Sequence, residues 1–306
     1  MTRGGLLRIL DTLLEFPGIH LLEEHFTPAA VRLRLCKSQP GPFNWLLLPG
    51  GPGIGSESLA GLAACLDVPG AIWLVDLPGD GSNVALPPAD ECYRHWPKVL
   101  LEAAQALPNC IYVGHSTGGM YLLSVPELED HICGLVLISS APDAGWRERF
   151  GEMVSDNPLP AVESASHRFE TCRSNETLRE LTLAAAEWNF TPDGLAAGRR
   201  LLATLPFNLA AVDWSESNFE AQYTAKWWPR ATPVLILSGS EDRIVAQNCW
   251  ESSHFRDKNV TWTKIDCAGH FPWVEQPSAV AAAFSDLARV ILERHSKTDE
   301  EHKKAS

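Results

Sequence analysis

Residues 114–119 read GHSTGG and place Ser116 between glycines, directly after the apolar stretch CIYV. A serine in a Gly-x-Ser-x-Gly pattern between a strand and a helix lies on a cramped turn, which requires small neighbours and lifts the hydroxyl clear of the sheet. The helix that follows aims its N-terminal amides at the same point, where they stabilise developing negative charge. We therefore predict that Ser116 is a catalytic nucleophile.

A serine nucleophile needs a histidine base, and that base needs a carboxylate to orient it. When the serine lies on such a turn, the acid and then the histidine follow it along the chain. His270 stands in CAGHFPWVEQP after the apolar stretch VTWTKI, and Asp242 stands in SGSEDRIV after PVLIL. We predict His270 as the base and Asp242 as the orienting acid, with the adjacent Glu241 as its alternative. His115, next to the serine, is expected to pack rather than to react.

A third motif, LPGGPG at residues 48–53, follows the apolar stretch WLLL. The oxyanion of an acyl-transfer intermediate needs two amide donors, normally one from the residue after the nucleophile and one from a loop after an early strand. We predict that these donors are Thr117 and Gly51. Gly50 is the alternative to Gly51, because Pro52 has no N–H.

Apolar stretches of strand length recur along the chain and alternate with turns and helix-like segments: VRLRL, NWLLL, AIWLVD, NCIYV, CGLVLI, PVLIL and VTWTKI. This alternation is typical of a mostly parallel sheet covered by helices. Residues 19–35 predict an antiparallel hairpin at the sheet edge. Residues 144–229 show helical spacing and no strands, so we predict a core of residues 1–143 and 230–306 with an inserted helical cap. Residues 296–306 are expected to be a disordered tail.

The net charge of −13 argues against nucleic-acid or anionic-membrane partners, because a negative surface repels phosphate. The eight cysteines are scattered and include no Cys-x-x-Cys pair, so no metal site is expected. We expect free thiols in a reducing cytoplasm. No cofactor is implied by the sequence. Charged residues interrupt the apolar pattern of residues 1–16, so no integral membrane segment is expected. Leu6, Leu10, Leu13 and Leu14 fall on one helical face, which is expected to dock on the protein's own core, with a membrane surface as the alternative. The oligomeric state stays open.

Over nearly its whole length the sequence resembles the α/β-hydrolase superfamily, whose nucleophile, acid and histidine motifs match GHSTGG, GSEDRIV and GHFPWVEQP in that order. The resemblance implies an α/β-hydrolase fold, with a mostly parallel central sheet of about eight strands and an inserted helical cap. DLPGDGSN is similar to the superfamily's DLPGHGxS loop, with Asp80 in place of the histidine. LPGGPG is similar to the HGGPG loop of the prolyl aminopeptidase group, with Pro49 in place of the leading histidine.

Members of that group hold the free amine of the substrate with acidic residues of the cap. The resemblance implies that Glu187, in AAAEWNF, is their counterpart here. The cap is also rich in tryptophan, and we predict that Trp146, Trp188 and Trp214 line an apolar substrate pocket above the serine. Three further acidic residues of the cap are expected to form a solvated surface: Asp213, Glu216 and Glu220.

These residues predict a serine hydrolase that acts through an acyl-enzyme on a small ester, thioester or amide. A proline iminopeptidase-like aminopeptidase is the alternative within the same chemistry, so the substrate is a small molecule or a short peptide. A catalytically inactive ligand-binding protein of the same fold is a third possibility, since the fold alone does not fix the reaction.

Overall fold

The computed structural model describes residues 21–84, 92–251 and 255–305. Their strands form one sheet of eight, as the sequence predicts. The strands are β1 (Glu23–Phe26), β2 (Arg32–Ser38), β3 (Asn44–Leu48), β4 (Ala71–Asp76), β5 (Cys110–His115), β6 (Ile132–Ile138), β7 (Val234–Gly239) and β8 (Val260–Ile265).

The strand order in the sheet is β1-β2-β4-β3-β5-β6-β7-β8, and the pairs from β4 to β8 are all parallel. Strands β1 and β2 form the antiparallel edge hairpin expected from residues 19–35, and β2 pairs antiparallel with β4. Because parallel strands end at the same edge of a sheet, the loops after β3, β5 and β7 are brought together there. Those loops carry three of the motifs singled out in the sequence.

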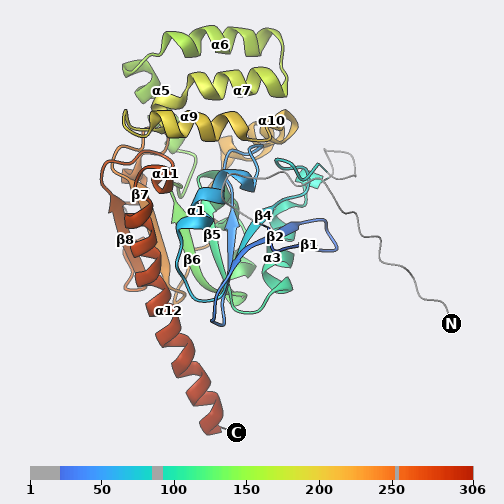
Figure 1. The fold of residues 1–306 in the computed structure, drawn as a ribbon, viewed down its shortest axis with the longest axis vertical. Coiled ribbons are helices and arrows are strands. Elements are labelled where there is room, and N and C mark those ends of the chain that lie inside the picture. The colour runs from blue at the N-terminus through green and yellow to red at the C-terminus, as the bar shows by residue number, and fades with distance from the viewer. Residues whose placement is uncertain (1–20, 85–91, 252–254, 306) are drawn as a thin grey trace, which may run out of the picture.

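Helices cover both faces of the sheet (Figure 1). Trp45 and Leu47 of β3 pack with α1 (Ala60–Cys65) and α12 (Pro277–Ala305) on one face. Leu46 and Leu48 point to the other face and pack with α3 (Trp96–Ala106) and α4 (Thr117–Leu122). Strands buried on both faces must be apolar throughout, which explains the continuous apolar runs of β3, β5 and β7.

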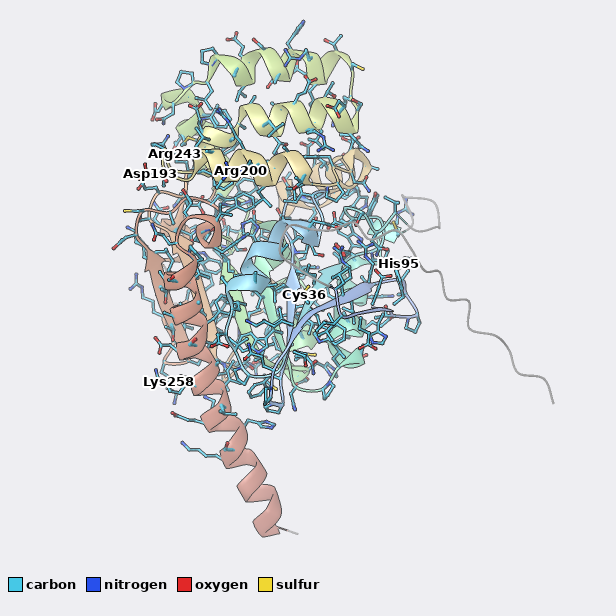
Figure 2. The ribbon with its side chains drawn as sticks, in the orientation of Figure 1. Cys36, His95, Asp193, Arg200, Arg243 and Lys258 are labelled. Atoms are coloured by element: carbon cyan, nitrogen blue, oxygen red, sulfur yellow. The ribbon has the colours of Figure 1, made fainter. Side chains whose placement is uncertain are left out.

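Between β6 and β7 the chain forms a layer of helices that lies over one end of the sheet (Figure 1). These helices are α5 (Trp146–Asp156), α6 (Pro160–Thr171), α7 (Asn175–Ala184), α8 (Ala186–Asn189), α9 (Leu195–Thr204) and α10 (Leu209–Asn218). We call this layer the cap; its boundaries as a separate domain stay a prediction. Charged side chains such as Asp193 and Arg200 are exposed on it, and Arg243 is exposed on the loop after β7 (Figure 2).

The expectation of a disordered tail is wrong, because helix α12 continues to Ala305. Residues 296–306 consist largely of Lys, Glu and Ala, which favour helix even where they have no apolar face to bury. The docking expected for Leu6, Leu10, Leu13 and Leu14 lies outside the described residues. Within the described residues, no helix combines the length and apolarity needed to cross a membrane.

Candidate active site

Ser116 lies at the junction of β5 and α4 with backbone angles φ 50° and ψ −125°. A positive φ is uncommon for a residue with a side chain, and the turn holds it by a 2.8 Å hydrogen bond from the Ser116 N–H to the Ile138 carbonyl. A Cβ on Gly114 would lie 2.6 Å from the Cα of Gly119, and one on Gly118 would lie 2.4 Å from the Pro49 carbonyl oxygen. The glycines of GHSTGG are therefore required by close backbone contacts.

His270 and Asp242 come from the loops after β8 and β7 and meet directly. The Nδ1 atom of His270 lies 3.1 Å from each carboxylate oxygen of Asp242. Asp242 Oδ1 also accepts hydrogen bonds from the N–H groups of Ile244 and Val245, and its side chain is only 1% exposed. Glu241 is exposed. The structure thus pairs the histidine with the predicted acid and not with its alternative.

The loop between β3 and the 3-10 helix Ser56–Leu59, residues 49–55, approaches the serine closely. A Cβ on Gly50 would lie 2.6 Å from the Cβ of Ser116 and 3.1 Å from the amide nitrogen of Thr117. Gly51, the next residue, lines a cavity together with Ser116 and Thr117. As the first residue of α4, Thr117 has an N–H with no acceptor inside the helix. These positions suit the pair of amide donors predicted for an oxyanion.

Buried carboxylates accept hydrogen bonds from the 49–55 loop and from the first residue of the 3-10 helix that follows it. Asp80 Oδ1 accepts a 2.7 Å hydrogen bond from the Gly53 N–H, and Asp76 Oδ1 accepts one of 2.8 Å from the Ser56 N–H. Burial, together with the neighbouring charge of Asp76, raises the pKa of Asp80 to about 7. The residue that stands where the superfamily has histidine therefore anchors the loop.

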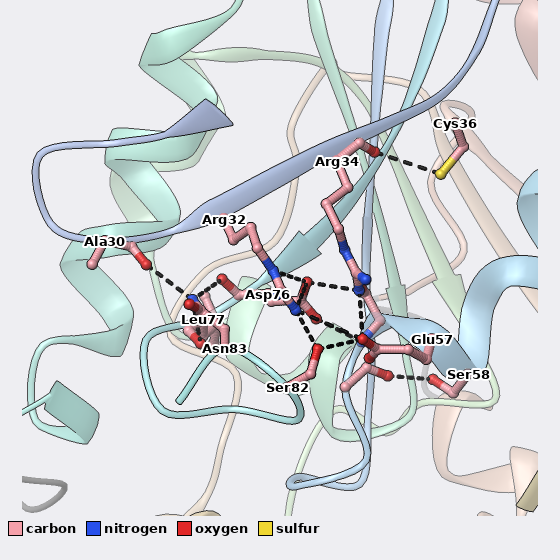
Figure 3. A network of polar contacts seen from close by, with 12 residues as sticks. Ala30, Arg32, Arg34, Cys36, Glu57, Ser58, Asp76, Leu77, Ser82 and Asn83 are labelled. Carbon is pink, nitrogen blue, oxygen red and sulfur yellow. Dashed lines mark hydrogen bonds and ion pairs between the residues drawn. The ribbon is translucent and has the colours of Figure 1, made fainter. Parts of the chain in front are cut away.

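Two arginines balance the charges of Asp76 and Glu57 in a buried ionic cluster (Figure 3). Arg34 lies 2.9 Å from both Asp76 and Glu57, and Arg32 lies 3.0 Å from Asp76. The side chains of Arg34 and Glu57 are each 4% exposed, and that of Asp76 is fully buried. Charges this deeply buried need such partners, because desolvation is costly for an unpaired ion.

The cavity at Ser116 has a volume of about 220 Å³ and lies between the sheet edge and the cap. Five of the predicted site residues line it: Gly51, Ser116, Thr117, Trp146 and His270. The remaining lining residues are Pro52, Ile54, His115, Leu178, Thr182, Asn189, Leu202, Phe207, Val212, Ile244 and Phe271. The structure therefore brings the predicted nucleophile, base and amide donors to one apolar cavity.

Three of the four predicted substrate-binding residues do not line this cavity. Glu187 is exposed and forms an ion pair of 3.1 Å with Arg199. Trp188 is buried within the cap, where its indole N–H donates to the Asn157 carbonyl, and Trp214 packs against Trp96 with ring centroids 5.4 Å apart. These predictions are wrong because a helical pattern does not reveal which face of a cap helix meets the serine.

The expected acidic surface of the cap is correct for two of its three members. Glu216 is exposed, the side chain of Asp213 is about half exposed, and both pair with Arg173. Glu220 is instead buried, pairs with Arg147 at 3.2 Å and has its pKa raised by burial.

His115 does more than the packing expected of it. Its Nε2 lies 3.0 Å from the main-chain oxygen of His270, which only accepts, so Nε2 carries the proton. Its ring contacts those of His270, Phe271 and Trp273, with centroids 4.8–4.9 Å apart. Burial lowers the pKa of His115 well below its usual value, which keeps the ring neutral. His115 therefore supports the main chain that carries His270.

Glu275 is a second supporting residue that sequence reasoning missed. One carboxylate oxygen accepts the Gly269 N–H at 2.6 Å, and the other accepts the N–H and hydroxyl of Thr191 in the cap. The His270 N–H donates to the Asn189 carbonyl, also in the cap. The only sequence signal for Glu275 was its place five residues after His270 in the motif GHFPWVEQP.

Comparisons with known proteins agree with this fold. A model of the family described as alpha/beta hydrolase matches residues 45–283. The pimeloyl-[acyl-carrier protein] methyl ester esterase of Xanthomonas campestris pv. campestris is 26% identical over 238 residues, which cover 69% of this chain and 82% of that protein. A solved proline iminopeptidase-related protein from Thermus thermophilus gives a TM-score of 0.64 at 22% identity over 88% of this chain and 98% of its own. An esterase from a Rhodococcus species gives a TM-score of 0.59 at 17% identity, and the match covers 88% of this chain and 98% of the esterase.

Proposed function

The chain belongs to the alpha/beta hydrolase family, as its motifs predict, and from this premise we propose that it is a serine hydrolase that cleaves small carboxylic esters through an acyl-enzyme. One observation carries the proposal. Ser116, on its positive-φ turn, lines the same cavity as His270, and the Nδ1 of that histidine faces both oxygens of the buried Asp242. This is the arrangement that activates a serine hydroxyl.

In the proposed reaction, Ser116 Oγ attacks the carbonyl carbon of the ester and His270 takes the hydroxyl proton through Nε2. Asp242 orients the imidazole and stabilises its positive charge, while the amides of Thr117 and Gly51 stabilise the oxyanion. The C–O bond then breaks, and the alcohol leaves with the proton from His270. Water attacks the acyl-enzyme by the same route and releases the acid.

An ester is favoured over an N-terminal proline peptide by the chemistry of the cavity wall. An aminopeptidase needs a carboxylate close to the serine to hold the substrate's ammonium group. Of the described residues that line the cavity, none is Asp or Glu, and Glu187 is paired with Arg199 outside it. An ammonium group in this cavity would be desolvated without a partner, which is costly.

A fluorophosphonate probe tests the nucleophile, with Ser116→Ala as the control. We expect the wild type to be labelled and the variant not to be. Turnover of p-nitrophenyl butyrate and proline p-nitroanilide then separates esterase from aminopeptidase, and we expect only the ester to react. An unlabelled wild type would overturn the proposal and favour an inactive binding protein, whereas faster turnover of the anilide would favour the aminopeptidase.

The proposal includes a cytoplasmic location. All eight cysteines lie among the described residues and are free thiols, which is the state expected in a reducing compartment. Fractionation of the producing cells tests this, with recovery in the cytosolic fraction as the expected result.

A further inference from the structure

The wall of the cavity is mainly apolar. On the cap side, apolar side chains of α7, α9, α10 and the loop between α9 and α10 line the cavity. On the core side, apolar side chains from the loops after β3, β7 and β8 line it. The apolar members are Pro52, Ile54, Leu178, Leu202, Phe207, Val212, Ile244 and Phe271. A surface of this kind gains free energy only from apolar groups of a substrate.

The polar side chains of the wall are neutral, and three of them have a hydrogen bond within the protein. Thr182 Oγ1 donates to the Leu178 carbonyl of its own helix, and Asn189 Nδ2 donates to the Ala185 carbonyl. His115 Nε2 donates to the His270 carbonyl. Trp146 contributes a neutral indole N–H that is buried without an acceptor in the described structure. His115 Nδ1 is likewise buried with no partner among the described residues. The polar atoms that the wall offers are therefore all neutral.

No cation is directed into the cavity either. Of the described residues that line it, none is Lys or Arg. The guanidinium of Arg179, on the helix that carries Leu178 and Thr182, lies over the ring of Phe207 and donates to the Ala203 carbonyl. Arg147, beside Trp146 in the sequence, is paired with Glu220. A carboxylate or an ammonium group at the end of a substrate's acyl chain would be buried here without a counter-ion.

From this wall we propose that the site selects esters whose acyl chain is uncharged and apolar. A volume of about 220 Å³ holds roughly seven groups the size of a water molecule or a methylene, which corresponds to a medium-length chain. The inference rests on the proposed esterase function and adds a substrate class to it. The products are the free acid with that chain and the alcohol, with one water consumed.

The length of the chain is limited by one face of α7. Leu178 and Thr182 are one helical turn apart, so both side chains point the same way, and both line the cavity. Neither is fully buried, so a larger side chain at Thr182 has room to enter the cavity without first displacing packed core residues. Thr182 is therefore the position at which the depth of the site is most readily changed.

The first test compares acyl groups on one leaving group. We expect kcat/KM for p-nitrophenyl esters to rise by up to about fourfold per methylene from acetate to a maximum between hexanoate and octanoate, and then to fall. The p-nitrophenyl ester of adipic acid, with its free carboxylate, is expected to react at least about 100-fold more slowly than its own methyl ester. Equal rates for this pair, or no dependence on chain length, would overturn the inference.

The second test changes the depth. In Thr182→Trp, the ratio of kcat/KM for octanoate to that for acetate is expected to fall at least about 100-fold. Glu176→Trp places the same side chain on the exposed side of α7 and is expected to leave the ratio unchanged. Leu178→Phe is a milder second variant with a smaller shift in the same direction. An unchanged ratio in both cavity variants would overturn the inference.

Labelling by the fluorophosphonate probe separates the two levels of failure. If the wild type and Thr182→Trp are both labelled but show no preference for apolar chains, the serine hydrolase stands and the substrate class is wrong. If the wild type is not labelled, the proposed function itself is wrong.

Discussion

The two walls of the cavity are held by different forces. On the core side, the 49–55 loop lies on buried, directional contacts, with Asp80 bonded to Gly53 and Asp76 bonded to Ser56 and both arginines. On the cap side, apolar side chains such as Leu202 and Phe207 pack in the hydrophobic core, and several ion pairs lie on the exposed surface. Directional contacts fix atoms within narrow limits, whereas apolar packing tolerates substitutions of similar volume.

This difference separates two tasks. The core side must place amide donors and a proton acceptor precisely enough for chemistry, where small displacements are costly. The cap side has only to offer a surface that suits the substrate. Changes on the core side should therefore reduce rate or stability, and changes on the cap side should alter substrate preference.

The largest expected effect is on the core side at Asp242. Asp242→Asn keeps the shape of the side chain but removes the charge that orients His270 and stabilises its protonated form. We expect kcat for an ester substrate to fall by about 10⁴-fold, as when the orienting acid of a serine protease triad is replaced in this way. Steady-state kinetics measures the loss, and circular dichroism confirms the fold.

Glu241→Gln is the matched control, because it removes the neighbouring carboxylate, which is exposed. Its kcat should stay within about threefold of wild type, since the side chain does not contact the histidine. A greater loss in Glu241→Gln than in Asp242→Asn would contradict the pairing seen in the structure.

Next in size is the stability supplied by the buried cluster. Arg34→Met removes one cation and leaves Asp76 and Glu57 buried with fewer partners, so we expect the free energy of unfolding to fall by about 3–5 kcal/mol. Arg168→Met breaks the exposed pair with Glu180 in the cap and should cost less than about 1 kcal/mol. Urea denaturation measures both, and equal losses would remove the contrast between the two walls.

The sequence predicts the core side well because the chemistry restricts it. A serine between glycines after an apolar stretch, an acid and a histidine after later stretches, and a glycine-rich loop after an early one each require particular residue types at particular places. Parallel strands then bring those places to one edge of the sheet. Ser116, Thr117, Gly51 and His270 line one cavity for this reason, with Asp242 behind the histidine.

The cap side could not be predicted in the same way. Leu178, Leu202 and Phe207 carry no signature, because an apolar residue at helical spacing looks alike in a core and in a cavity wall. Of the tryptophans chosen by composition, Trp146 lines the cavity, whereas the indole of Trp188 packs inside the cap. How helices joined by short loops face one another depends on packing that only the folded chain reveals.

Asp80 gives the core side a pH dependence. Burial raises its pKa to about 7 in the folded protein, against about 3.9 for an unperturbed carboxyl. Between these pH values the folded state binds a proton that the unfolded state does not. This residue therefore makes the free energy of unfolding fall as the pH rises from about 4 to about 7, and the loss is complete above about pH 7. In Asp80→Asn this cost is absent, and the amide oxygen can still accept the Gly53 N–H.

We therefore expect the stability of Asp80→Asn relative to wild type to increase between pH 4 and pH 8, by at most about 4 kcal/mol. Urea denaturation at several pH values measures this difference. Asp193→Asn, which removes an exposed carboxyl of the cap (Figure 2), is the control and should show no such trend. A difference for Asp80→Asn that is constant with pH would show that its carboxyl does not titrate in this range.

The smallest expected effect is at Glu187. Like Asp242, this residue is predicted from the sequence to be a functional carboxylate. Asp242 is buried and bonded to His270, whereas the side chain of Glu187 is half exposed and paired with Arg199. Because exposed pairs contribute little, Glu187→Gln should change kcat/KM for esters by less than about twofold. The same variant should leave any turnover of proline p-nitroanilide unaffected. A selective loss with the anilide would mean that the cap side recognises an amine, and that the two walls do not divide their tasks as we argue.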